Sequence, residues 1–165
     1  MTIHYLTVGL MFGDENKGST VEFLAAQNGA TLVVRNVGGV NAAHNVVFSD
    51  RVDRNGYDFH TYNQFGSATH LGCKTYLGKH FRFAPFHLVN EAKHLIELGI
   101  QYPFDMVYVD ERSLLTLPYH EAYSMQQAPI HARGTTGLGV GDTVRYAERY
   151  PDMAIYAGDM RDRGL

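Results

Sequence analysis

Phe12-Gly13-Asp14-Glu15-Asn16-Lys17-Gly18-Ser19 separates a short apolar run, Tyr5 to Leu10, from an amphipathic segment that starts near Ser19. This order predicts a strand, a glycine-containing loop and the start of a helix. Glycine lets the backbone approach an anion closely, a helix N-terminus offers unpaired N–H groups, and Lys17 adds a mobile positive charge. The stretch therefore predicts a site for a nucleotide phosphate.

This first loop is not a Walker A loop, because the spacing GxxxxGK[ST] is absent and a carboxylate, Asp14, lies inside it. Asp14 could bind Mg²⁺ together with phosphate oxygens, or it could take a proton from the group that is to be phosphorylated. Asp14 and Glu15 could also simply cap the helix, whose dipole favours negative charge at this end. The loop alone leaves these alternatives open.

Composition indicates one ordinary globular domain, since the chain has 165 residues of which 45% are apolar. A net charge of −3 without a basic block argues against a nucleic-acid surface and against an anionic membrane as partner. The single cysteine, Cys73, cannot form an internal disulfide, and no apolar run approaches the ~20 residues of a membrane span. Without a signal-peptide pattern at the N-terminus, we expect a cytoplasmic protein.

Strand-like and helix-like segments alternate along the chain, which predicts an α/β fold with a mostly parallel central sheet and flanking helices. Its general architecture should be similar to that of P-loop NTPases, with a β-hairpin excursion and one domain over residues 1–165. The expected strands are Tyr5 to Leu10, Thr31 to Val37, Ala43 to Phe48, Tyr57 to Tyr62 and Phe104 to Asp110. The expected helices are Ser19 to Asn28, Pro85 to Leu98, Pro118 to Gln127 and a last one from Asp142, after a loop from Ala128 to Gly141.

A second loop, Gly38-Gly39-Val40-Asn41-Ala42-Ala43-His44-Asn45, directly follows the strand Thr31 to Val37. Loops that follow parallel strands gather at one edge of the sheet, so this loop can face the first one. Asn41 can donate and accept hydrogen bonds, and His44 titrates near neutral pH and can donate to a phosphate oxygen. A lone histidine beside an apolar segment is more simply a satisfied core or surface residue.

A third loop, Arg133 to Gly141, places the hydroxyls of Thr135 and Thr136 on a glycine-rich backbone, which is typical of a nest for a monophosphate. Such loops are common and by themselves indicate little. A zinc site is an alternative use of four other residues, His60, His70, Cys73 and His80, although their spacing matches no compact zinc module.

Together the three loops resemble the adenylosuccinate synthetase family, whose members join IMP and aspartate at the expense of GTP. FGDENKG (12–18) is similar to the family's WGDEGKG, GGVNAAHNVV (38–47) to GGHNAGHTVV, and GTTGLGVG (134–141) to GTTGRGIG. The motifs occur in the family's order, and the resemblance spans nearly the whole chain.

The resemblance implies roles for individual residues. Asp14 matches the base that takes the N1 proton of IMP and also holds Mg²⁺, Lys17 matches the lysine that offsets charge on the transferred phosphoryl group, and His44 matches the general acid at the departing β-phosphate. The carbonyl of Ala43 matches a magnesium ligand. The implied GTP-binding residues are Gly13, Asp14, Glu15, Asn16, Lys17, Gly18, Ser19, Ala43, His44 and Asn45. The implied IMP-binding residues are Asp14, Asn41, Thr135, Thr136 and, from a partner subunit of a homodimer, Arg149, with Arg145 as second choice.

Departures from the family pattern lie at several of these positions. Asn16 and Ala43 replace glycines; asparagine is among the few residues that tolerate positive φ, whereas Ala43 requires a backbone that is not restricted to glycine. Asn45 replaces a threonine and Leu138 an arginine. A phage branch of the family that acts on dGMP carries serine in place of Asp14, so Asp14 favours IMP.

Family subunits are substantially longer than this chain, and the parts that read the guanine base and bind aspartate lie downstream of the matched region. The chain is therefore expected to be a fragment, half of a split enzyme, or a short relative that binds a purine nucleotide without catalysis.

Overall fold

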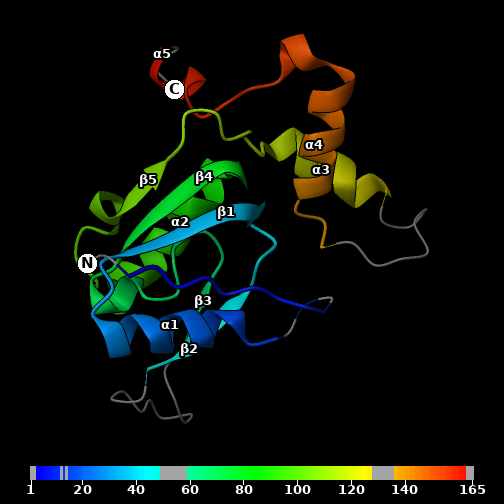
Figure 1. Cartoon of the computed structure of the whole chain (residues 1–165). Coiled ribbons are helices and arrows are strands. Elements are labelled where there is room, and N and C mark those ends of the chain that lie inside the picture. The colour runs from blue at the N-terminus through cyan, green and yellow to red at the C-terminus, as the bar shows by residue number, and fades with distance from the viewer. Residues whose placement is uncertain (1–2, 12, 14, 49–58, 128–135, 163–165) are drawn as a thin grey trace.

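The computed structural model describes residues 3–11, 13, 15–48, 59–127 and 136–162, and its centre is a parallel sheet of three strands in the order β1-β4-β5 (Figure 1). The strands are β1 (Leu32–Gly39), β2 (His44–Val47), β3 (Phe59–Tyr62), β4 (Lys74–Arg82) and β5 (Val107–Val109). The α-helices are α1 (Lys17–Asn28), α2 (Pro85–Glu97), α3 (Pro118–Gln127), α4 (Val140–Arg149) and α5 (Asp159–Asp162). Short 3-10 helices cover Thr69–Leu71, Pro103–Met106 and Pro151–Met153.

The sheet confirms the predicted α/β class. β1 and β4 pair in parallel, as do β4 and β5. β2 and β3, which come between β1 and β4 in the sequence, form a separate antiparallel hairpin. Parallel neighbours need a long crossover, which α2 supplies between β4 and β5. In Figure 1 the carboxyl ends of β1 and β4 point towards α3 and α4.

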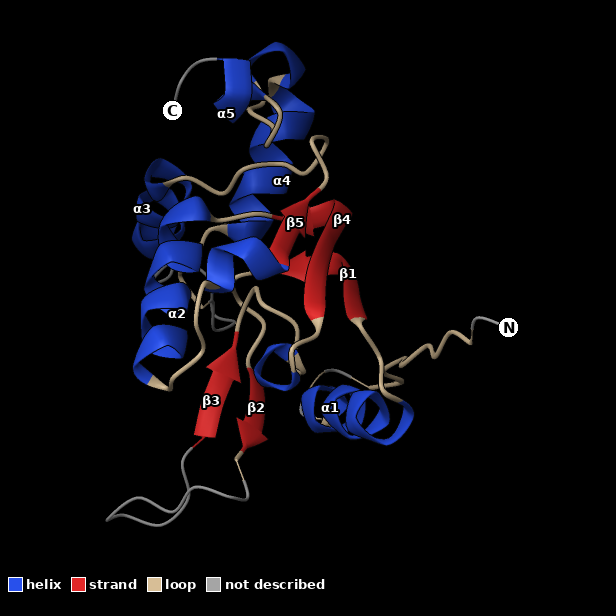
Figure 2. Ribbon diagram, turned by 90° about the vertical axis from the view of Figure 1, so that its left-hand side faces the viewer, coloured by secondary structure: helices blue, strands red, loops and turns tan. Residues whose placement is uncertain are grey.

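One face of the sheet carries the main core. Buried side chains of β4, α2 and the hairpin form one apolar cluster, which includes Leu77, Phe81, Leu88, Leu95 and Tyr62. Figure 2 shows α2 beside the sheet, with the hairpin below it in that view. Pro85 in the first turn of α2 suits this position, because the first N–H groups of a helix have no partner within it.

The opposite face of the sheet is open in the described part of the chain. The strand register aligns Val34 with Tyr76 and Tyr76 with Tyr108 across the three strands. Val34 remains 58% exposed and Tyr108 48% exposed. Parallel sheets are usually covered on both faces, so this face has room for further polypeptide.

The predicted strand Tyr5 to Leu10 is wrong, because residues 3–10 form no strand. The segment lies along α1 instead: the Tyr5 hydroxyl donates to Asn28 Oδ1 at 2.7 Å, and the Met11 N–H donates to the Glu15 carboxylate. An apolar, β-prone run becomes a strand only beside another strand, and this run has no such neighbour. Leu6 and Leu10 consequently remain about nine-tenths exposed.

Other element boundaries differ by a few residues from those predicted. Gly38 and Gly39 end β1 rather than opening the second loop, and α4 begins at Val140 rather than Asp142. The strand expected from Phe104 is shorter, because a 3-10 turn occupies 103–106. The hairpin is confirmed over β2 and β3, while its expected polar turn lies outside the described residues.

The sequence reading missed the middle strand of the sheet, β4. Thr75 and Leu77 alternate with more exposed neighbours as a strand requires, but Gly78-Lys79-His80 interrupts the apolar pattern.

None of the helices in the described ranges has the length and apolar character needed to cross a bilayer.

Candidate functional site

The first loop turns sharply into α1 through positive backbone angles. Gly13 has φ 129°, and Asn16, directly before the helix, has φ 58° and ψ 29°. This confirms that the position at which the family carries glycine is left-handed here, which asparagine tolerates better than most residues. The Glu15 carboxylate accepts hydrogen bonds from Met11 N–H and from the Lys17 ammonium group. Lys17 therefore lies at the helix N-terminus, held by an acidic neighbour.

The second loop lies directly against this helix N-terminus. A Cβ atom at the buried Gly18 would be 2.6 Å from the Cβ atom of His44, so only glycine lets α1 approach β2 this closely. One residue further along each of these two segments, Ser19 Oγ donates to the Asn45 carbonyl at 3.1 Å. The start of α1 and the start of β2, which are separated in the sequence by the rest of α1 and by β1, thus form one local structure.

His44 has an electrostatic environment that favours its neutral form. Burial lowers the pKa of His44 to about 4, and the positive charges of Arg35 and Lys17 act in the same direction. A neutral imidazole keeps one N–H donor, and an anion bound between Lys17 and His44 would oppose the effect of both cations.

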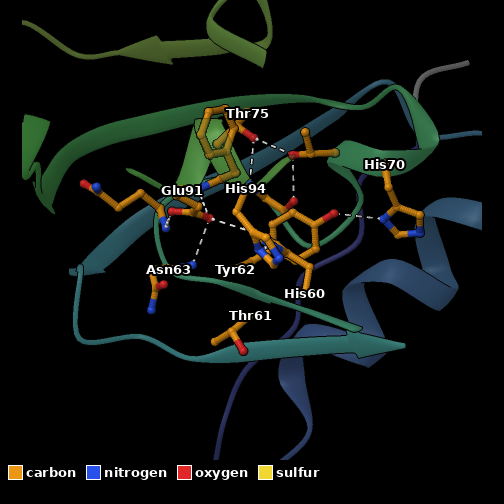
Figure 3. Close-up of polar contacts among 12 residues, drawn as sticks. His60, Thr61, Tyr62, Asn63, His70, Thr75, Glu91 and His94 are labelled. Carbon is orange, nitrogen blue, oxygen red and sulfur yellow. Dashed lines mark hydrogen bonds and ion pairs between the residues drawn. The ribbon is translucent and has the colours of Figure 1, made fainter. Parts of the chain in front are cut away.

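The turn before His44 is tied to the segment that follows β3. Asn63 Nδ2 donates to the carbonyls of Val40 and Ala42, at 3.3 and 2.5 Å. The Asn63 N–H in turn donates to Oε1 of the buried Glu91 at 3.0 Å (Figure 3). Ala43 does not have a positive φ, so its backbone conformation suits alanine as well as glycine.

Among the described residues, the third loop approaches the second-loop motif at the start of α4. A Cβ atom at Gly39 would lie 3.0 Å from both methyl groups of Val140. Thr136 and Arg149 are exposed, and no hydrogen bond or ion pair joins either of them to the first two loops in the described ranges. Arg145, the second choice for the partner arginine, pairs with Asp142 at 2.5 Å.

The structure thus brings together part of the predicted site. Lys17, Gly18, Ser19, His44 and Asn45 are in one place, with Asn41 and Ala43 on the adjoining turn. No hydrogen bond or ion pair in the described ranges joins Thr136 or Arg149 to them. Asp14 and Thr135 fall outside the described residues.

The alternative zinc site receives no support from the geometry. His60 Nδ1 lies 2.8 Å from His94 Nδ1, Tyr62 Oη lies 3.1 Å from His70 Nδ1, and the Cys73 thiol donates to the Ala30 carbonyl at 2.8 Å. Across the residues that the structure describes, no group of three or more His, Cys, Asp or Glu side chains could hold a metal ion.

Comparison with known proteins adds to this geometry. The family model described as adenylosuccinate synthetase matches residues 6–164. The chain belongs to the adenylosuccinate synthetase family. It is 32% identical to the adenylosuccinate synthetase of Deinococcus radiodurans over 158 residues, which cover 96% of this chain and 35% of the relative. The enzyme of Thermus thermophilus is 33% identical over 157 residues, which cover 94% of this chain and 34% of the relative.

Solved structures of the family share the fold. A fully ligated adenylosuccinate synthetase from Plasmodium falciparum superposes with a TM-score of 0.71 at 18% identity, over 91% of this chain and 33% of that one. The succinoaminodeoxyadenylate synthetase of cyanophage S-2L, bound to dGMP and dATP, gives a TM-score of 0.63 at 18% identity, over 92% of this chain and 40% of that one. The chain spans about a third of the length of the curated relatives that it matches.

Asn63 and Glu91 were not singled out from the sequence. Their partners lie 21 to 28 residues away along the chain, so no local spacing signals the contacts. The only local signal is a glutamate among the apolar positions of α2, since a buried glutamate normally has a specific partner.

Proposed function

We propose that this chain forms the phosphate-binding part of a GTP-dependent ligase that joins IMP and L-aspartate through a 6-phosphoryl-IMP intermediate. The observation that carries the proposal is the close approach of Gly18 to His44, which puts the helix N-terminus, Lys17 and an imidazole at one point. Phosphoryl transfer depends mainly on positioning and on stabilising spread negative charge, and these groups supply both.

Each group in the cluster has a task that its chemistry supports. The N–H groups at the start of α1 bind phosphate oxygens, and Lys17 exchanges its Glu15 partner for the transferred phosphoryl group. His44 donates a hydrogen bond to the leaving β-phosphate. The bound anion would raise the imidazole pKa and so favour protonated His44, the form that can act as general acid. Asp14, by its match to the family base, removes the N1 proton of IMP.

Magnesium fits the donor set of this site, since Mg²⁺ prefers carboxylate and carbonyl oxygens. Asp14 and the carbonyl of Ala43 would hold it, and the ion would neutralise charge on the phosphate oxygens. The ordinary backbone of Ala43 is compatible with this role.

The IMP side of the site is supplied by residues outside the cluster. Asn41 and the hydroxyls of Thr135 and Thr136 would bind IMP, with Thr136 at the 5′-phosphate. Arg149 would reach that phosphate from the second subunit of a homodimer, which accords with its exposed position at the end of α4. Asp14 favours IMP over dGMP as substrate.

A purine-nucleotide-binding module without catalysis is the second candidate. The observation that favours it is the length of the match, about a third of each curated relative. A module of this kind would bind the nucleotide phosphate without consuming the nucleotide.

Calorimetry and a product assay separate these two functions. The chain is titrated with IMP, GTP and dGMP in the presence of Mg²⁺, and the mixture with L-aspartate is then assayed for adenylosuccinate. Binding of IMP and GTP with product formation that Asp14→Ala abolishes supports the ligase. Binding without product supports the module, and absence of binding contradicts both.

A further inference from the structure

The side chain of Asn63 holds the turn that precedes β2. Its side-chain nitrogen donates to the carbonyls of Val40 and Ala42, which lie on either side of Asn41. The turn is closed from within by the Ala42 N–H, which donates to the Gly39 carbonyl at 3.1 Å. One carboxamide nitrogen thus fixes two peptide planes of the second loop, a task that needs two N–H donors on one atom.

The backbone of Asn63 is itself fixed by two buried charged groups. Its N–H donates to Glu91 Oε1 at 3.0 Å (Figure 3). Its carbonyl accepts a hydrogen bond from Arg35 Nη1 at 2.5 Å. Glu91 is 7% exposed and Arg35 8% exposed. Glu91 also accepts the N–H groups of Gln64 and Phe65, at 2.8 and 3.2 Å. Three backbone N–H groups on one carboxylate leave this segment little freedom.

We propose that Asn63 is a positioning residue for the nucleotide site. By fixing the peptide planes on both sides of Asn41, its amide sets the direction of the Asn41 side chain, of the Ala43 carbonyl and of the His44 imidazole. This inference rests on the proposed function, because the three groups matter only if a nucleotide binds there. The chain of contacts runs from the core residues Arg35 and Glu91 through Asn63 to the loop.

Amide hydrogen exchange tests the clamp without any ligand. In Asn63→Ala the backbone bonds to Glu91 and Arg35 remain, so exchange at the Ala42 N–H should become about tenfold faster while the β1–β4 amides stay unchanged. Asn63→Leu, which keeps the side-chain size but has no donor, should give the same result and covers the case in which the alanine variant folds poorly. Asn28→Ala is the matched control, because Asn28 also donates to a backbone carbonyl, that of Leu24 at 2.8 Å.

Calorimetric titration with GTP and Mg²⁺ tests positioning. Both Asn63 variants should bind about tenfold more weakly than the unaltered chain, and Asn28→Ala should bind normally. Unchanged affinity with faster exchange would make Asn63 merely structural and overturn the inference, as would weaker binding with unchanged exchange. If the unaltered chain binds neither GTP nor IMP, the proposed function fails, and the exchange measurement then decides the clamp by itself.

Discussion

The two halves of the candidate site differ in how firmly the chain holds them. The first and second loops are joined by the Gly18–His44 contact and by the bond from Ser19 to the Asn45 carbonyl, and Asn63 ties their turn to the core. In the described part of the third loop, the approach to the second-loop motif is that of Val140 to Gly39, and Thr136 and Arg149 remain exposed.

This difference indicates a division of labour within the site. In the proposed function, the groups that bind the polyphosphate are those of the first and second loops, and the groups assigned to IMP include Thr136 and Arg149, which have no described contact with them. Substitutions in the first and second loops should therefore alter GTP binding by the chain itself, and substitutions in the third loop or in α4 should not. The predictions below follow that order.

Gly18→Ala should have the largest effect. Its Cβ atom would lie 2.6 Å from the Cβ atom of His44, so α1 and β2 must separate. We expect unfolding free energy to fall by about 1–3 kcal/mol, as for other overpacked sites, and GTP affinity to fall more than about tenfold. Urea denaturation and calorimetry measure the two effects. The matched control is Gly141→Ala, where the nearest atom would be 3.6 Å away, and equal behaviour of the two variants would refute the contact.

Lys17→Met should weaken GTP binding by about ten- to a hundredfold, since it removes a charge-assisted contact to phosphate. Stability should change little, because the ion pair with Glu15 is partly exposed to solvent, and such pairs contribute little. Lys74→Met removes an equal charge beside Tyr108 and serves as control. Similar affinities for the two variants would show that Lys17 does not meet the phosphate.

His44 should make both stability and binding depend on pH between about 4 and 6.5. Its folded pKa of about 4 lies below the ordinary value of 6.5, so the unfolded chain takes up a proton first and stability falls as pH drops through this window. A bound polyphosphate should raise the pKa again, which predicts uptake of about half a proton per nucleotide near pH 5.

Calorimetry in buffers of different ionisation enthalpy measures this proton uptake. His44→Gln should abolish it. If uptake persists in that variant, another group accounts for the proton and His44 does not face the phosphate.

Arg149→Ala should have the smallest effect. Arg149 is exposed at the end of α4, 5.5 Å from the centre of the Tyr150 ring. Stability should change by less than about 0.5 kcal/mol, and GTP affinity of the chain by less than about twofold. A tenfold loss of GTP affinity would show that α4 takes part in GTP binding together with the first and second loops, and would remove the distinction between these parts of the site.

Local signals in the sequence predicted most of the helices and the special backbone. The boundaries of α3 were predicted without error, and the left-handed angle of Asn16 follows from its position in a glycine motif. The run Tyr5 to Leu10 has strand composition but no strand beside it, and β4 has a central position in the sheet that its interrupted pattern hides. Pairing decides whether a strand forms, and pairing is not a local property.

The candidate site shows the same limit. Motifs identified Lys17 and His44 one by one, whereas the close approach of His44 to Gly18, next to Lys17, becomes visible only in three dimensions. Asn63 carries no motif, because its role depends on carbonyls more than twenty residues away.

The most direct test of the central claim is a titration of the ¹⁵N-labelled chain with GTP and Mg²⁺, followed by amide chemical shifts. We predict that amides of residues 15–19 and of residues 40–45 shift together with one dissociation constant, because both groups line one anion site. Shifts confined to one of the two groups, or separate dissociation constants for them, would contradict the account.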